Sequence, residues 1–229
     1  MARVTYECDA GVATITMDDG KVNALSPDMQ AEINAALDKA EADQAVVILT
    51  GNAKALSAGF DLSIITTPGP QSLAMLRGGF LLSERLLSFP TPVIIAASGH
   101  AIAMGFFLLL SGDYRIGVDK PVKLVANEVQ IGMTLPWAAI EITRHRLTKN
   151  AYQRMLDLAE PIAVGEAVAA GVLDAVVPED QLMSTARDVA ERFASTLNME
   201  AHRGTKARVR ADMLKAIREA NDLEFPAAT

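Results

Sequence analysis

Two short segments rich in small residues could place backbone amides for chemistry. Residues 57–61 (SAGFD) and 99–105 (GHAIAMG) each follow an apolar run that is typical of a buried strand. Where a strand gives way to a helix, the first N–H groups have no partner in the chain, and the helix dipole adds positive potential. Two such junctions on adjacent parallel strands can direct two N–H groups at one oxygen, which forms an oxyanion hole. The alternative is that both segments are simple turns. The spacing alone does not decide between an oxyanion hole and simple turns.

A third segment, residues 126–132 (ANEVQIG), carries one carboxylate among apolar neighbours, directly after a predicted strand. If Glu128 is buried there, its pKa is raised and it becomes a usable general base at neutral pH. Most acidic residues are solvated instead. Residue type and position therefore leave both roles open for Glu128.

Other catalytic motifs are absent from the sequence. It contains no phosphate-binding GxxxxGK[ST], no GxGxxG, no GxSxG, no HExxH and no paired CxxC. His100, His145 and His202 lie far apart with no ligand spacing. We therefore expect no metal site; His100 is a weaker candidate for lining a site, and the other two are expected in solvent.

The elements that must position these segments alternate between strand and helix, which predicts an α/β body. A turn signal at residues 9–11 predicts a hairpin over residues 3–17, and Ser26 followed by Pro27 predicts a helix N-terminus. Hydrophobic periodicity predicts the rest. The further expected helices are residues 71–88, 105–112, 137–146, 150–158 and 165–170, and the further strands 46–51, 93–97, 113–118, 122–125 and 172–177.

The character of the chain changes after residue 178, so we predict a core over residues 1–178 and a helical region over 179–229. The first helix of that region has one apolar face, formed by Leu182, Ala186, Val189, Phe193 and Leu197. A second, highly charged helix is expected over residues 204–221, with an apolar edge of Val209, Met213, Leu214 and Ile217. These helices would dock on the body or on a neighbouring subunit.

Composition narrows the class of protein. Half of the 229 residues are apolar, which excludes a disordered chain and a disulfide scaffold. The formal charge of −7 argues against nucleic acid or an anionic membrane as a partner. The single cysteine, Cys8, and the absence of a signal-peptide pattern lead us to expect a cytoplasmic protein.

One apolar stretch is long enough to suggest a membrane-spanning helix instead of a cytoplasmic protein. Residues 93–110 are eighteen residues long, close to the minimum that crosses a bilayer. Residues 98–100 (SGH) interrupt the stretch near its middle, and two prolines precede it. We therefore interpret it as a buried strand followed by a short buried helix.

Taken in order, these segments resemble the crotonase (enoyl-CoA hydratase/isomerase) superfamily over nearly the whole chain. The N-terminal hairpin is followed by VNALSPDM, and LSAGFDL resembles the first oxyanion loop. ASGHAIAMGFFLLLSGDYRIG resembles the second loop, NEVQIGMTLP the glutamate-bearing loop, and GEAVAAGVLDAVVPEDQL the segment that leads to the C-terminal helices.

The resemblance implies a crotonase (ClpP-like) ββα spiral with a C-terminal helical trimerisation region. It further implies a homotrimer or a dimer of trimers, and acyl-CoA thioester substrates of fatty acid metabolism with no additional cofactor. By position in the motifs, the N–H groups of Phe60 and Met104 would hold the thioester oxygen, and Glu128 would move the proton.

The sequence departs from the hydratase pattern at one position. Hydratases of this superfamily hold water between two glutamates, and the first of these falls on Phe107 here. The remaining pattern looks like the monofunctional Δ3,Δ2-enoyl-CoA isomerases, which keep only the later glutamate. The leading hypothesis is therefore an isomerase that uses Glu128 alone; the alternatives are an enoyl-CoA hydratase, another lyase or a hydrolase, and a non-catalytic binding protein on the same scaffold.

The motifs also nominate residues around the substrate. The expected substrate-binding positions are Ala24, Lys54, Ala58, Gly59, Asp61, Leu62, Gly105 and Phe107. Asp61 is expected chiefly to fix its own loop, and Lys54 to meet CoA phosphate, with Lys21 and the basic stretch at residues 206–210 as weaker candidates. The loop over residues 64–71 is a candidate wall of the acyl pocket, whereas Glu84 and Glu141 are expected on solvated helix faces.

Overall fold

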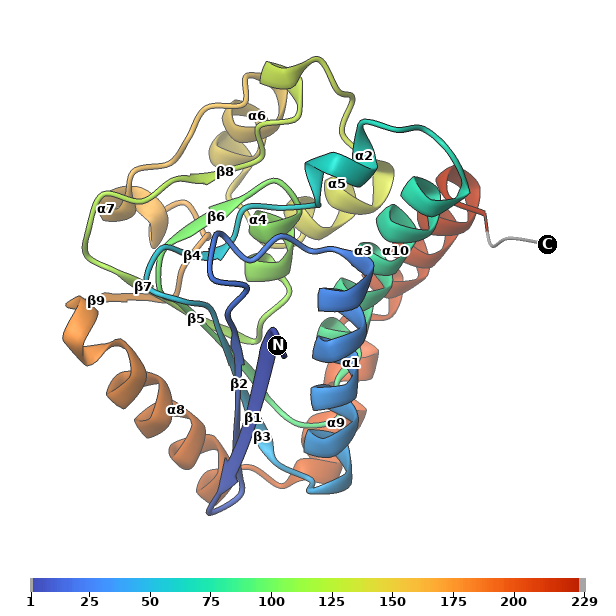
Figure 1. Ribbon diagram of the computed structural model, residues 1–229. Helices are drawn as coiled ribbons and strands as arrows, with labels where there is room; N and C mark the ends of the chain where they lie inside the picture. Colours follow the sequence, from blue (N-terminus) through green and yellow to red (C-terminus); the bar gives the residue numbers. More distant parts are fainter. Residues whose placement is uncertain (1, 227–229) are drawn as a thin grey trace.

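The computed structural model describes residues 2–226 and contains two β-sheets surrounded by helices (Figure 1). The strands are β1 Val4–Asp9, β2 Val12–Met17, β3 Val46–Thr50, β4 Ala55–Ser57, β5 Val93–Ala97, β6 His100–Ile102, β7 Tyr114–Val118, β8 Leu124–Val125 and β9 Ala175–Val177. The α-helices are α1 Pro27–Ala42, α2 Leu62–Ile65, α3 Pro70–Ser88, α4 Met104–Leu110, α5 Trp137–Arg144, α6 Lys149–Asp157, α7 Val164–Ala167, α8 Leu182–Thr196, α9 Met199–Val209 and α10 Ala211–Glu224, and two 3₁₀ turns are η1 Val129–Ile131 and η2 Glu179–Gln181.

The larger sheet has the strand order β1-β2-β3-β5-β7-β9. β1 and β2 form the predicted antiparallel hairpin, turned by Ala10 and Gly11, which both have positive φ. All other neighbours in this sheet are parallel. β3 and β5 are buried along their whole length, because helices cover both faces of the sheet, which explains their continuous apolar sequences.

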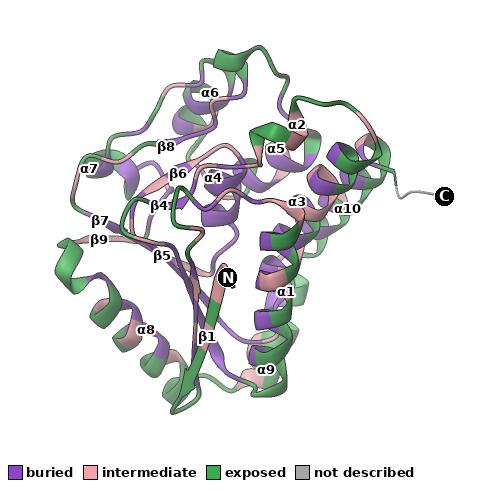
Figure 2. Ribbon diagram, viewed as in Figure 1, coloured by how far each residue is buried: buried purple, intermediate pink, exposed green. Residues whose placement is uncertain are grey.

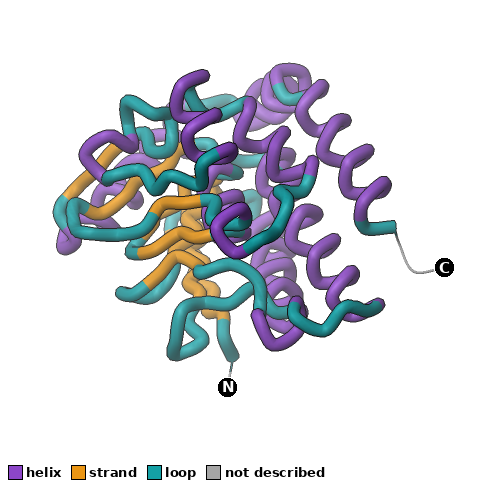
Figure 3. The backbone as a smooth tube through the Cα atoms, turned by 90° about the horizontal axis from the view of Figure 1, so that it is seen from above, coloured by secondary structure: helices purple, strands orange, loops and turns teal. Residues whose placement is uncertain are grey.

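The two faces of the large sheet pack different helices. α8 covers one face and α1, α3 and α4 lie on the other (Figures 1 and 3). In Figure 2 the inner strands and the inward helix faces are buried, while the edge strand β1 and the outer face of α8 are largely exposed. Most of the predicted apolar face of α8 is confirmed, since Leu182, Ala186 and Val189 are buried against the sheet and Phe193 packs beside them. Leu197 was wrongly expected on that face, because it follows the last residue of α8 and is 39% exposed.

The smaller sheet positions the two candidate loops. Its order is β4-β6-β8, with parallel neighbours, and Ala55 pairs with His100. Since β4 and β6 run in the same direction, residues 57–61 and the turn into α4 leave the same edge of this sheet. The sequence analysis missed both strands, because three-residue strands carry too few residues to show an alternation.

Two expectations for the later part of the chain are wrong in detail. The helix expected over residues 204–221 is two helices, α9 and α10, separated at Arg210. Arg210 leaves helical geometry while its side chain pairs with Asp113 at 2.6 Å and donates to the Leu87 carbonyl at 2.8 Å. Val209, expected on the apolar edge, is 79% exposed. The strand expected over residues 172–177 is shortened to β9.

The predicted domain boundary at residue 178 and the predicted trimeric assembly stay predictions. Within the single chain, α10 packs against α3 and α5, and α8 against the large sheet. Among residues 2–226, no helix has both the length and the apolar composition to cross a bilayer, and the stretch over residues 93–110 forms β5, β6 and α4.

Candidate active site

The two loops that follow β4 and β6 are in contact. Gly59 has φ +96°, and a Cβ built there would lie 3.0 Å from the Ala103 Cβ and 3.4 Å from the Met104 nitrogen. These distances are tighter than ordinary van der Waals contacts, and the positive φ would strain any residue with a side chain at position 59. The structure therefore brings the backbone beside Phe60 and the backbone of Met104 to one place.

Both candidate amides are free in the described part of the chain. The N–H groups of Phe60 and Met104 donate no hydrogen bond to residues 2–226. Met104 is the first residue of α4, whose N-terminal amides lack helical partners. Ala103 before it has φ 51° and ψ −125°, a strained conformation for a residue with a Cβ that turns the chain from β6 into α4.

Buried hydrogen bonds fix the first loop. The Ser57 hydroxyl donates to the Asn23 carbonyl at 2.7 Å and accepts from the Gly59 N–H at 3.1 Å. The Asn23 side-chain amide, fully buried, donates to carbonyls of β2 and β4. The Asp61 carboxylate accepts from the Ser63 N–H at 2.9 Å and so caps α2, as expected for a residue that fixes its own loop. The sequence analysis did not foresee the role of Asn23, whose only local signal is its place three residues before the expected helix cap, Ser26.

A cavity of about 210 Å³ opens beside these loops, between α2, α3, α4 and the turn at η1. Its walls are mostly apolar. The lining residues are Ala58, Phe60, Leu62, Ile65, Leu76, Phe80, Ile102, Ala103, Phe107, Asn127, Glu128, Ile131, Met133 and Pro136. In Figure 1 α2 and the start of α5, which supply some of these residues, lie in the upper part of the view, and α4 lies nearer the middle of the molecule.

Glu128 is the one titratable side chain among the residues that line this cavity. It is 6% exposed, and burial raises its pKa to about 7. Its backbone carbonyl accepts hydrogen bonds from Ile131 and Met133, which fixes the turn that carries it. The carboxylate atom Oε2 is buried without a hydrogen-bond partner within the described chain. The turn thus holds the carboxyl in place, and one carboxylate oxygen is left free to accept a proton from a bound ligand.

The remaining walls of this cavity are apolar. Phe107 lies on the fully buried helix α4 and is 1% exposed. The neighbouring aromatic wall includes Phe60 and Phe80. Asn127 adds one polar atom, since its Oδ1 is buried without a partner in the described chain.

Five of the eight predicted substrate-binding residues line this cavity or a second one, whereas Gly59, Gly105 and Lys54 line neither. Ala58, Leu62 and Phe107 line the apolar cavity, whereas Ala24 and Asp61 line an adjoining polar cavity of about 370 Å³. Other residues of the polar cavity are Arg3, Asp19, Lys21, Ser26, Pro27, Asp28, Ile64 and Gln71. Ile65 joins the apolar wall, as expected for the loop over residues 64–71. Lys54 is exposed and lines neither cavity.

Of the weaker candidates, Lys21 lines the polar cavity, and the others lie outside the site. Lys206 and Arg210 are ion-paired with Asp113, so the basic stretch serves packing between α9 and the start of β7. Glu84 pairs with Arg218, and Glu141 with Arg144.

The histidines do not form a site. The His100 Nδ1 accepts from the Lys123 N–H at 2.8 Å, at the edge of the small sheet. His145 is exposed, as expected, whereas His202 is half-buried. Within residues 2–226, no cluster of histidine, cysteine and acidic side chains is placed to hold a metal.

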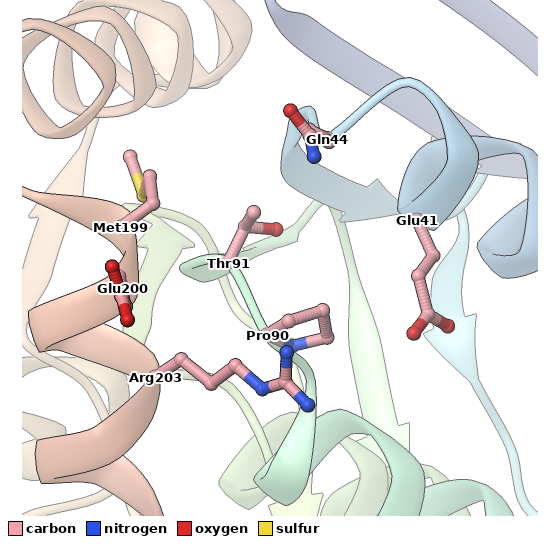
Figure 4. Close-up of a pocket in the computed structure, with 7 residues that line it drawn as sticks. All are labelled: Glu41, Gln44, Pro90, Thr91, Met199, Glu200 and Arg203. Carbon is pink, nitrogen blue, oxygen red and sulfur yellow. The ribbon is translucent and has the colours of Figure 1, made fainter.

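A wider cleft lies elsewhere, between the end of α1, the loop before β5 and the start of α9 (Figure 4). Its volume is about 460 Å³, and Glu41, Glu200 and Arg203 contribute charges to it. None of its lining residues belongs to the two loops or to the turn of Glu128. The size of the cleft alone therefore does not make it a competing active site.

Two neighbouring loops with free amides, a buried carboxylate and an α/β fold of this topology are the features expected of a crotonase-type enzyme. A family model described as enoyl-CoA hydratase/isomerase matches residues 7–225. Human mitochondrial enoyl-CoA delta isomerase 1 is 32% identical over 215 residues, which cover 91% of this chain and 71% of the relative. The chain belongs to the enoyl-CoA hydratase/isomerase family.

Solved structures share the whole fold. An enoyl-CoA isomerase from Mycobacterium tuberculosis is 48% identical, with a TM-score of 0.92 and 96% of each chain covered. Human mitochondrial delta3-delta2-enoyl-CoA isomerase is 30% identical, with a TM-score of 0.91, and 98% of this chain and 91% of that chain are covered. A crystal structure of the same mycobacterial protein describes it as a probable enoyl-CoA hydratase. The names of relatives therefore do not separate the two reactions.

Proposed function

We propose that this chain is a Δ3,Δ2-enoyl-CoA isomerase in which Glu128 alone transfers the proton. The observation that carries the proposal is a single titratable side chain in an otherwise apolar cavity, beside two loop amides that are free. Phe107 occupies the position where a hydratase places the glutamate that helps to hold water. An apolar wall there favours a shift of the double bond over the addition of water.

The proposed reaction needs three parts of the chain. The thioester carbonyl oxygen accepts hydrogen bonds from the Phe60 and Met104 N–H groups, which lowers the energy of negative charge on that oxygen. Ionised Glu128 removes a proton from C2, and the electron pair of that C–H bond enters a dienolate. The protonated carboxyl then delivers the proton to C4 while the double bond forms between C2 and C3, so no atom is gained or lost.

The polar cavity supports the same proposal. It adjoins the apolar one through the loop at residues 58–62, and it contains Lys21, which can meet a CoA phosphate. Arg3 in the same cavity is ion-paired with Asp28 and Glu32. We therefore propose that the CoA portion lies on this side and the acyl group in the apolar cavity. The enzyme would use no cofactor beyond the CoA of its substrate. The expected cytoplasmic location and the trimeric or hexameric assembly are part of this proposal.

A hydratase is the alternative that one observation favours. The unpartnered Oδ1 of Asn127 lies in the wall of the same cavity and can accept a hydrogen bond from water. Supplying 3-hexenoyl-CoA and crotonyl-CoA separately distinguishes the two reactions. We expect conjugation of the first thioester, seen as rising absorbance of the enoyl thioester, and no loss of the second. Rapid loss of crotonyl-CoA without conjugation of 3-hexenoyl-CoA is the result that refutes an isomerase.

The raised pKa of Glu128 predicts the pH dependence of the reaction. The base must be ionised, so kcat/KM should rise about tenfold per pH unit below about 7 and level off above it. A carboxylate with its ordinary pKa of 4.5 would give a flat profile over this range. Initial rates with 3-hexenoyl-CoA between pH 5.5 and pH 8.5 test the prediction, and a flat profile contradicts it.

A further inference from the structure

The floor of the apolar cavity is made of two layers of aromatic rings. Phe80 on α3 is the centre of the cluster: its ring lies 6.4 Å from that of Phe60 and 6.3 Å from that of Phe107. These three rings line the cavity. Behind them, the Phe225 ring stacks on Phe80 at 6.0 Å and 4°, but it does not reach the cavity. Phe225 is thus the second layer, and it blocks the space into which the Phe80 ring would otherwise turn.

The end of α10 is anchored so that Phe225 stays behind Phe80. Arg77, one turn before Phe80 on α3, donates to the Phe225 carbonyl at 2.7 Å and pairs with Asp222 at 2.7 Å. The Glu224 carboxylate accepts from the N–H of Trp137 at 2.8 Å, which ties the same end of α10 to α5. Phe225 itself is 8% exposed. The second layer is therefore supported by contacts to two helices.

The volume limits what fits in front of this floor. At about 30 Å³ per water-sized group, a cavity of 210 Å³ holds about seven carbons, which would be C2 to C8 of an acyl chain whose C1 lies at the loop amides. We propose that Phe80, supported by Phe225, closes the acyl cavity and restricts this enzyme to acyl chains of about eight carbons or fewer. This inference rests on the proposed function, because it assumes that the apolar cavity receives the acyl group.

Binding of saturated acyl-CoAs tests the inference without depending on catalysis. Calorimetric titration with butanoyl-, hexanoyl-, octanoyl-, decanoyl- and dodecanoyl-CoA should show affinity rising about fourfold for each buried methylene. We expect this rise to stop near octanoyl-CoA in the unmodified enzyme. A rise that continues evenly to dodecanoyl-CoA overturns the proposal.

Two variants then locate the floor. Phe225→Ala removes the ring of the second layer, and Phe80→Leu removes the central ring of the first layer. In each variant the affinity for acyl-CoA should therefore keep rising for about two carbons beyond the limit of the unmodified enzyme. Phe225→Ala keeps the test available if Phe80→Leu does not fold. Leu223→Ala and Leu81→Ala change exposed neighbours on α10 and α3 and should keep the original limit. An unchanged limit in folded Phe225→Ala and Phe80→Leu also overturns the proposal.

The assays separate the two proposals. If the chain-length limit shifts in the variants as expected but 3-hexenoyl-CoA is not isomerised, the isomerase assignment is wrong and the proposal that Phe80 and Phe225 close the cavity is supported. If isomerisation is observed but no variant shifts the chain-length limit, the proposal that Phe80 and Phe225 close the cavity is wrong and the isomerase assignment is supported. If no acyl-CoA binds, both are wrong.

Discussion

Glu128→Gln should lower kcat for 3-hexenoyl-CoA by about 10²–10⁴-fold, which is the usual contribution of a positioned general base. The glutamine amide matches the carboxyl in size but cannot accept the proton from C2, and no other titratable side chain lines the cavity. Single-turnover rates measure the loss. Affinity for hexanoyl-CoA should change little, because the loops and the apolar walls remain.

Glu141→Gln is the matched control, since Glu141 pairs with Arg144 on α5 and does not line the cavity. It should retain the unmodified rate. If Glu128→Gln retains most of its activity, proton transfer runs through another group. If neither the unmodified chain nor Glu128→Gln converts any enoyl-CoA, the chain is a non-catalytic binding protein on this scaffold.

The same substitution should stabilise the fold at high pH. Burial raises the Glu128 pKa from 4.5 to about 7, so the folded state favours the protonated carboxyl. The unmodified protein therefore loses stability as the pH rises from 4.5 through 7, by about 3 kcal/mol in total. Glu128→Gln does not titrate, so its advantage in unfolding free energy should appear at pH 8 and vanish near pH 4.5. Urea unfolding at both values measures it.

Gly105→Ala should disable the site through its backbone. A Cβ at position 105 would lie 2.1 Å from the Ser57 carbonyl oxygen and 2.9 Å from the Ser57 Cβ, so α4 must move away from β4. That movement carries the Met104 amide with it, and the loss of one oxyanion donor typically costs 10²–10³-fold in kcat. The strain of overpacking should also lower the unfolding free energy by about 1–3 kcal/mol.

Gly204→Ala is the control for this substitution. Gly204 is exposed within α9, and a Cβ added there would meet no other segment of the described chain within 4 Å. Alanine there should raise stability by about 0.5–1 kcal/mol through helix propensity and leave kcat unchanged. A Gly105→Ala enzyme with normal kcat would show that the Met104 amide does not stabilise the reaction.

The larger elements were predictable because each carries a local signal. The buried strand over residues 93–97 matches β5 residue for residue, and Ser26 caps α1 through the N–H of Met29, as its residue type predicted. Short elements were not predictable, because β4, β6 and α2 are too short for a periodicity. The break between α9 and α10 was missed for another reason: the pairing of Arg210 with Asp113 depends on a segment almost a hundred residues earlier.

The sequence by itself determined the alternation of strands and helices, the family to which the chain belongs, and the absence of a glutamate at position 107. Those features depend on residue identity and on contacts between near neighbours in the chain. Only the tertiary structure decided that Glu128 is buried with a free oxygen, that the loops at Gly59 and Met104 meet, and that Phe225 stands behind Phe80. Burial and distance between remote segments depend on how the whole chain packs, and no local pattern of residues encodes them.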